Sequence, residues 1–118
     1  MGTVNLTEST FEETILSPGI IFVDFWAEWC GPCRMFGPIF EAASETNPDI
    51  VFAKVDTEAE PGIASAAGIS SIPTLMAFRD GVLLFRESGA LPAEPLAKLI
   101  QAIRDVNMEE VRAAIAND

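Results

Sequence analysis

Two cysteines separated by a glycine and a proline are the residues of this 118-residue chain best suited to chemistry. Cys30 and Cys33 stand in the stretch WAEWCGPCRMFGP, and the sequence contains no other cysteine. Two thiols this close can bind a metal ion, form a permanent structural disulfide, or act as a redox couple that is oxidised and reduced in turn. The rest of the composition distinguishes between these roles.

The absence of histidine excludes several kinds of site. Neither a hydrolase that pairs serine or cysteine with histidine nor a metal site that contains histidine can be built. A structural zinc ion usually takes four cysteine or histidine ligands, so two cysteines would suffice only if two subunits shared the metal. Two cysteines also fall short of the disulfide framework of small secreted domains. A redox couple is therefore the strongest candidate, and we expect no bound metal or cofactor.

Charge and hydropathy limit the partners and the location. The net charge is −11, from 18 acidic and 7 basic residues, so a nucleic-acid backbone would be repelled. No apolar run is long enough to cross a bilayer, and residues 1–6 lack the features of a signal peptide. We expect a cytoplasmic, monomeric protein that binds neither nucleic acid nor membrane. The length and the 49% apolar content suit a single domain over residues 1–118.

Strand and helix patterns alternate along the chain. The runs GIIFVDFW (residues 19–26) and IVFAKVD (residues 50–56) predict strands, the first buried on both faces. Helical spacing predicts a helix over residues 33–46, which Pro38 should kink. Asp80-Gly81 between two apolar runs predicts a hairpin. Three more helices are expected: one capped near Thr7 with Phe11, Ile15 and Leu16 on its inner face, a short one from Pro61 to Gly68, and a longer one from Pro92 to Val106.

This order predicts an α/β fold with a mixed central sheet and helices on both faces. Cys30 then follows a buried strand and Cys33 opens the next helix, at the sheet edge where α/β folds place reactive groups. A helix N-terminus carries about half a positive charge, which favours the thiolate that attacks disulfides. Pro32 fits the first helical turn, and Gly31 leaves room for an approaching sulfur.

Several segments resemble the thioredoxin family. VDFWAEWCGPC (residues 23–33) closely resembles the active-site segment of bacterial-type thioredoxins, including the whole Trp-Cys-Gly-Pro-Cys motif. SSIPTLMAF (residues 70–78) resembles the cis-proline segment of the family, FRDGV (residues 78–82) its hairpin turn, and GAL (residues 89–91) the loop before its last helix. The resemblance extends from about residue 6 to residue 106 and implies the thioredoxin fold.

The resemblance also implies a function. The chain would be a protein-disulfide reductase with a redox-active Cys30–Cys33 disulfide. Cys30 would attack the target protein as the nucleophile, and the more buried Cys33 would then resolve the mixed disulfide. A thioredoxin reductase would regenerate the dithiol. Targets would be proteins that contain disulfides.

Asp24 interrupts the apolar strand that precedes the cysteines. A charged, unpaired carboxylate in a buried strand costs several kcal/mol, so a misjudged strand end is one interpretation. The resemblance implies the other, a buried aspartate that transfers a proton to and from Cys33. It also implies that Lys54, in the following strand, neighbours this aspartate, although a solvated Lys54 is an equally simple interpretation.

A surface for substrates is implied around the cysteines. Pro73 is either an ordinary proline at a strand start or, as the resemblance implies, a cis-proline that presents the Ile72 backbone to an extended substrate. Trp26 is expected in the core. The implied binding surface comprises Trp29, Gly31, Pro32, Ile72, Pro73, Gly89 and Ala90.

Two features depart from the family pattern. Arg34 occupies a position where many thioredoxins have lysine. Residues 107–118 extend beyond the usual end of the domain, and the spacing of Met108, Val111 and Ile115 predicts either a short helix packed on the domain or a frayed tail. Alternatives to a reductase are an oxidase or isomerase of the same fold, and a binding module in which the fold serves as a scaffold.

Overall fold

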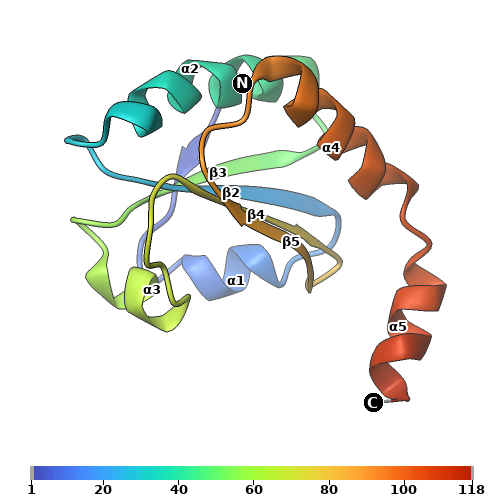
Figure 1. Cartoon of the computed structure of the whole chain (residues 1–118). Coiled ribbons are helices and arrows are strands. Elements are labelled where there is room, and N and C mark those ends of the chain that lie inside the picture. The colour runs from blue at the N-terminus through green and yellow to red at the C-terminus, as the bar shows by residue number, and fades with distance from the viewer. Residues whose placement is uncertain (1, 118) are drawn as a thin grey trace.

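The computed structural model describes residues 2–117. Its five-stranded sheet has the strand order β1-β3-β2-β4-β5 and lies between two layers of helices (Figure 1). The strands are β1 (Val4–Asn5), β2 (Ile20–Trp26), β3 (Val51–Asp56), β4 (Thr74–Arg79) and β5 (Val82–Ser88). The helices are α1 (Phe11–Ile15), α2 (Gly31–Thr46), α3 (Pro61–Ala66), α4 (Ala93–Asp105) and α5 (Met108–Ala116). β1 to β3 are parallel, while β4 and β5 are antiparallel to their neighbours, so the predicted mixed sheet is confirmed.

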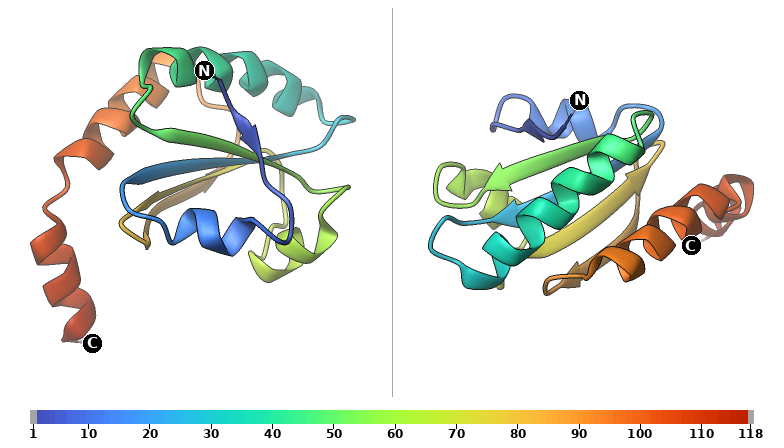
Figure 2. Two further views of the ribbon diagram at one scale, coloured as in Figure 1. Left: turned by 180° about the vertical axis from the view of Figure 1, so that it is seen from behind. Right: turned by 90° about the horizontal axis from the view of Figure 1, so that it is seen from above.

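The central strand β2 separates two apolar cores. Its alternate side chains point to opposite faces, so Phe22 faces α2 and α4 whereas Val23 and Phe25 face α1 and α3. Both helical layers are visible edge-on in Figure 1, and Figure 2 shows them from behind and from above. On the α2 side the Phe22 and Phe52 rings stack with centroids 5.6 Å apart. β2 is therefore buried on both faces, as its sequence predicts.

Local sequence signals fix most element boundaries. Asp80 and Gly81 both have positive φ, 52° and 83°, which is the conformation that a two-residue hairpin turn requires. Gly68 ends α3 in the left-handed region. Pro38 lies inside α2, where it removes the backbone donor that would otherwise pair with the carbonyl of Arg34.

Three details differ from the sequence-based expectation. Helix α1 has Thr10 as its N-cap residue rather than Thr7, and Thr10 makes no side-chain capping hydrogen bond. Leu16 does not face the core, because α1 ends at Ile15 and the Leu16 side chain is 59% exposed. The strand β1 was not predicted, since its two residues are both exposed and carry no apolar period. It joins the sheet through parallel pairing with β3 at Ala53 and Lys54.

The connection between α4 and α5 is held by a side chain of the sheet. Arg79 of β4 donates hydrogen bonds of 3.0 Å to three backbone carbonyls, those of Ile103, Arg104 and Val106. A guanidinium at this position satisfies carbonyls that the end of α4 would otherwise leave unpaired. These hydrogen bonds therefore fix the backbone between α4 and α5.

Helix α5 extends away from the sheet beyond this link (Figures 1 and 2). Asn107 is its N-cap residue, and the Asn107 side chain accepts a hydrogen bond from the amide of Glu110. Met108 is buried, whereas Ile115 on the last turn is 55% exposed. The apolar pattern of residues 108–115 thus produces a helix that contacts the domain mainly through its first turn.

The apolar side chains at the two ends of α5 should therefore contribute unequally to stability. Met108→Ala should lower the free energy of unfolding by about 2 kcal/mol, because it deletes a buried side chain. Ile115→Ala, the matched control, should change it by less than about 0.5 kcal/mol. Denaturant unfolding of both variants measures the difference. Equal effects of the two substitutions would mean that α5 packs along its whole length or not at all.

Candidate active site

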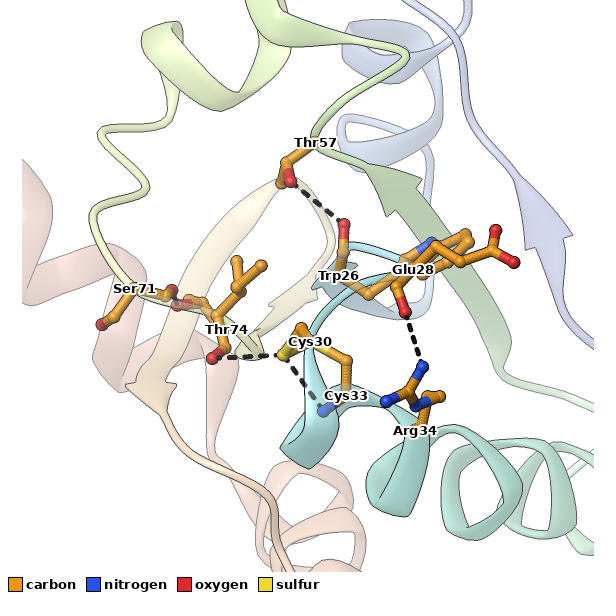
Figure 3. Close-up of a disulfide and its surroundings, with 9 residues drawn as sticks. Trp26, Glu28, Cys30, Cys33, Arg34, Thr57, Ser71 and Thr74 are labelled. Carbon is orange, nitrogen blue, oxygen red and sulfur yellow. Dashed lines mark hydrogen bonds between the residues drawn. A yellow bond between two sulfur atoms is a disulfide. The ribbon is translucent and has the colours of Figure 1, made fainter.

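The two cysteines lie where the chain passes from β2 into α2 (Figure 3). Cys30 is the N-cap residue of α2 and Cys33 lies in its first turn. Their sulfurs form a disulfide with a Cα–Cα distance of 5.2 Å. This distance lies within the range of about 4.4–6.8 Å usual for disulfides. Closing and opening this bond therefore requires no large backbone movement.

The start of α2 directs a backbone donor at one of the two sulfurs. The amide of Cys33 donates a hydrogen bond of 3.2 Å to the Cys30 Sγ atom. Pro32 has no N–H, so this amide is the first in the helix beyond Gly31 that can reach the sulfur. The positive end of the helix dipole acts on the same atom. Both features favour negative charge on the Cys30 sulfur.

A second segment approaches the disulfide from the start of β4. The Ile72–Pro73 peptide bond is cis, as the resemblance implies. The carbonyl oxygen of Ile72 lies 3.7 Å from the Cys30 Sγ atom. The amide of Gly89 donates a 2.8 Å hydrogen bond to the Pro73 carbonyl, which brings the segment after β5 to the same place. The start of α2 and the cis-proline segment thus meet at Cys30, and the segment after β5 lies against the cis-proline.

Exposure differs among the residues expected to bind substrate. Trp29 is 66% exposed, Gly31, Pro32 and Gly89 are exposed, and Ile72 is half-buried beside the cysteines. Pro73 is buried, and Ala90 packs partly against the core between the sheet and α4.

Two further findings concern α2. Met35 was missed by sequence reasoning, although at 70% exposure it extends the apolar surface by one turn of the helix beyond Gly31 and Pro32. Its exposure could have been inferred from helical spacing, because Met35 lies outside the buried stripe formed by Cys33, Phe36 and Phe40. The expectation that Cys33 is the more buried cysteine was wrong, because Cys30 is 3% and Cys33 5% exposed. Both sulfur-bearing residues are covered by the converging segments.

Arg34 supports the loop that precedes the cysteines. Its Nη1 atom donates a 3.3 Å hydrogen bond to the backbone carbonyl of Glu28, which Figure 3 shows beside the start of α2. The loop is held at its other end by Thr57, whose amide and hydroxyl both donate to the carbonyl of Trp26. The residue that departs from the family pattern therefore has a local structural role.

Asp24 is completely buried in β2, with an exposed fraction of 0%. It lies on the face of β2 that α2 covers, two residues after Phe22. Neither carboxylate oxygen has a hydrogen-bond partner. Burial raises the pKa of Asp24 from 3.8 to about 7, and the positive charge of Lys54 opposes part of this rise. The carboxyl group can therefore hold or release a proton near neutral pH.

Lys54 is the register partner of Asp24 in the neighbouring strand β3. Its ammonium group lies over the Trp26 ring, 4.8 Å from the centroid, in a cation–π contact. It acts on Asp24 through space, since it makes no hydrogen bond to the carboxylate. Trp26 itself is half-buried, and its indole N–H is buried without a partner.

A groove of about 490 Å³ lies away from this site, between α2 and α4. It is lined in part by Ile39, Ala43, Ala97 and Ile100. Within residues 2–117, no group of three or more cysteine, aspartate or glutamate side chains is placed to hold a metal ion. No helix in the same part of the chain is long and apolar enough to cross a membrane.

Known proteins resemble the chain along most of its length. A family model described as Thioredoxin matches residues 2–102. A protein assigned as thioredoxin 2 in Streptomyces coelicolor is 54% identical over 97% of this chain and 85% of its own length. Thioredoxin 1 of Synechococcus elongatus is 43% identical, with 80% of this chain and 91% of the relative covered. Thioredoxin of Chlamydia muridarum is 42% identical over 80% of this chain and 92% of its own length.

A solved structure has the same architecture. The structure of Plasmodium falciparum thioredoxin superposes with a TM-score of 0.78 at 32% identity, covering 85% of this chain and 98% of that chain.

The raised pKa of Asp24 makes stability depend on pH in a defined direction. The folded protein binds this proton more tightly than the unfolded chain, so the stabilising effect is complete below about pH 4 and is lost as the pH rises through about 7. A shift of about three units corresponds to about 4 kcal/mol. The free energy of unfolding of Asp24→Asn, relative to wild type, should therefore rise by about 4 kcal/mol between pH 4 and pH 8.

Asp49→Asn is the matched control for denaturant unfolding over this pH range. Hydrogen bonding from Arg104 holds the pKa of the exposed Asp49 below its usual range, so its stabilisation is present at neutral pH and is lost in acid. That loss falls below about pH 4, so the difference between Asp49→Asn and wild type should stay nearly constant between pH 4 and pH 8. A pH-independent difference between Asp24→Asn and wild type would show that Asp24 is an ordinary solvated carboxylate.

Proposed function

The chain belongs to the thioredoxin family of protein-disulfide oxidoreductases, and we propose that it reduces the disulfides of target proteins with Cys30 as nucleophile and Cys33 as resolving thiol. The main support is the 3.2 Å hydrogen bond from the Cys33 amide to the Cys30 sulfur at the start of α2. A donor at this position favours the thiolate form of Cys30, and the thiolate is the form that attacks a disulfide.

The first step is an exchange of one disulfide for another. The Cys30 thiolate attacks one sulfur of the target disulfide, so that a Cys30–target bond forms and the target S–S bond breaks. The other target sulfur leaves as a thiolate and takes a proton. No net electron transfer has occurred at this stage, and the two proteins are joined covalently.

The second step releases the target. Cys33 loses its proton and attacks the Cys30 sulfur, which forms the Cys30–Cys33 disulfide and breaks the Cys30–target bond. The second target sulfur leaves as a thiolate and takes a proton from solvent. Two electrons have then passed to the target, which is now a dithiol. We assign Asp24 as the group that takes the proton, because its pKa of about 7 leaves it able to accept one at neutral pH. The positive charge of Lys54 lowers the pKa of this carboxyl group.

Substrate binding is assigned to the apolar surface that surrounds Cys30. Trp29, Gly31 and Pro32 form its exposed side on the β2–α2 junction, and the cis Ile72–Pro73 segment forms the opposite side. An extended target chain could pair with the Ile72 backbone, as peptides do at exposed backbone edges. Gly89 and Ala90 complete the surface beside Pro73.

The proposal extends to the partners and the setting of the protein. We assign a thioredoxin reductase as the partner that returns the Cys30–Cys33 disulfide to the dithiol. The protein acts as a cytoplasmic monomer in electron transfer, with residues 1–118 forming one domain. Its strongly negative charge disfavours nucleic acid as a partner.

Trapping of targets tests the assigned order of attack. Cys33→Ser should accumulate mixed disulfides between Cys30 and target proteins, because the first step proceeds and the second cannot. Cys30→Ser should capture less than about a tenth as much, because the remaining thiol lacks the hydrogen bond that stabilises a thiolate. Mass spectrometry of the captured complexes measures the ratio, with the double variant as the background control. Equal capture by both single variants would contradict the roles.

The proton-transfer role of Asp24 has a separate kinetic test. Asp24→Asn should slow reduction of a protein disulfide about tenfold at pH 7, less than the roughly 10²–10⁴-fold contribution of a positioned base, since water can partly substitute. Stopped-flow measurement on the reduced protein gives the rate. Asp49→Asn serves as the surface control. An unchanged rate in Asp24→Asn would remove this residue from the mechanism.

A further inference from the structure

The loop that carries the Ile72 carbonyl is held at its beginning by a side chain of β5. Arg86 donates hydrogen bonds of 2.5 Å to the carbonyl of Ala67 and 2.7 Å to that of Gly68. These two carbonyls belong to the C-terminal end of α3, where the chain turns through the positive φ of Gly68. The guanidinium therefore fixes the point at which residues 69–73 leave the helix.

The same strand holds the other end of this loop. The Ser88 hydroxyl lies 3.1 Å from that of Ser71 and 2.9 Å from that of Thr74. Thr74 in turn donates to the backbone carbonyl of Ser71, and Figure 3 shows these two residues next to each other. Arg86 and Ser88 are two residues apart on one strand, so both project from the same face of β5.

We propose that Arg86 and Ser88 are positioning residues that set the Ile72 backbone against Cys30 and thereby determine how well extended protein targets bind. This inference rests on the proposed function, in which Ile72 forms part of the substrate surface. The side chains do not touch the reacting sulfurs. They act by fixing both ends of the segment that brings the Ile72 carbonyl to within 3.7 Å of the Cys30 sulfur.

Arginine suits this role for a geometric reason. Its planar guanidinium carries several donors in a fixed arrangement, so two hydrogen bonds to successive carbonyls define an orientation as well as a distance. A lysine would bring the same charge to the end of α3 but only a single flexible donor group. The conservative variant Arg86→Lys therefore separates charge from geometry.

The test compares two kinds of substrate with the reduced protein. Insulin offers an extended backbone next to its disulfides, whereas hydroxyethyl disulfide has no backbone at all. Arg86→Ala should lower the second-order rate constant for insulin about fivefold, which is the net effect of one ordinary hydrogen bond, and leave that for hydroxyethyl disulfide unchanged. Ser88→Ala should show the same split, and Arg86→Lys should recover part of the rate.

Arg112→Ala is the matched control, because Arg112 pairs with Asp80 at the hairpin turn rather than with the loop. It should react with both substrates as wild type does. Equal slowing of both substrates by Arg86→Ala would mean that the residue only stabilises the fold, and unchanged rates with both would mean that the loop keeps its place without it. Either result overturns the inference. Failure of the proposed function would look different, since wild type itself would then fail to reduce insulin.

Discussion

The burial of the Asp24 carboxyl group is the constraint on which the rest of the structure depends. Neither of its oxygens has a hydrogen-bond partner, and burial raises its pKa to about 7. At neutral pH and above this costs about 4 kcal/mol, a large part of the roughly 5–15 kcal/mol by which domains are usually stable. The fold sustains this cost because β2 is buried on both faces between two apolar cores. A strand at the edge of the sheet would leave the carboxyl group accessible to water.

The position of β2 also explains how the site is assembled. One continuous segment supplies the buried carboxyl, then the half-buried Trp26, and then Cys30 at the start of α2. The neighbouring strands complete the site, because β3 brings Lys54 beside Asp24 and the residue before β4 is the cis Pro73. The N–H of Cys33 donates to the Cys30 sulfur, while the Asp24 carboxyl lies buried in β2 on the face that α2 covers. In the proposed mechanism, these two groups act on different steps of the exchange.

Much of this could be predicted from the sequence, because the responsible signals are local. The Asp80-Gly81 pair predicts the hairpin turn because these residue types adopt the positive φ angles that the turn requires. The apolar run before Cys30 predicts the buried strand. The roles of Asp24 and Pro73 needed the family resemblance, since a carboxylate in an apolar run and a proline before a strand each allow two interpretations. The contacts of Arg79 and Arg86 could not be predicted, because each joins a side chain to backbone carbonyls of a distant element. The nearly equal burial of Cys30 and Cys33 likewise results from converging loops rather than from helix position.

The protonation of Asp24 can be observed directly in the oxidised protein, where no thiol titrates. Carbon-detected NMR of the Asp24 side-chain carboxyl as a function of pH gives the midpoint, with the exposed Asp49 as an internal reference in the same spectra. We expect a midpoint near 7 for Asp24, because burial disfavours its charged form and Lys54 compensates only in part. A midpoint near the ordinary value of about 3.9 would contradict the role of Asp24, since the carboxyl would then be charged throughout the physiological range and unable to take the proton of Cys33.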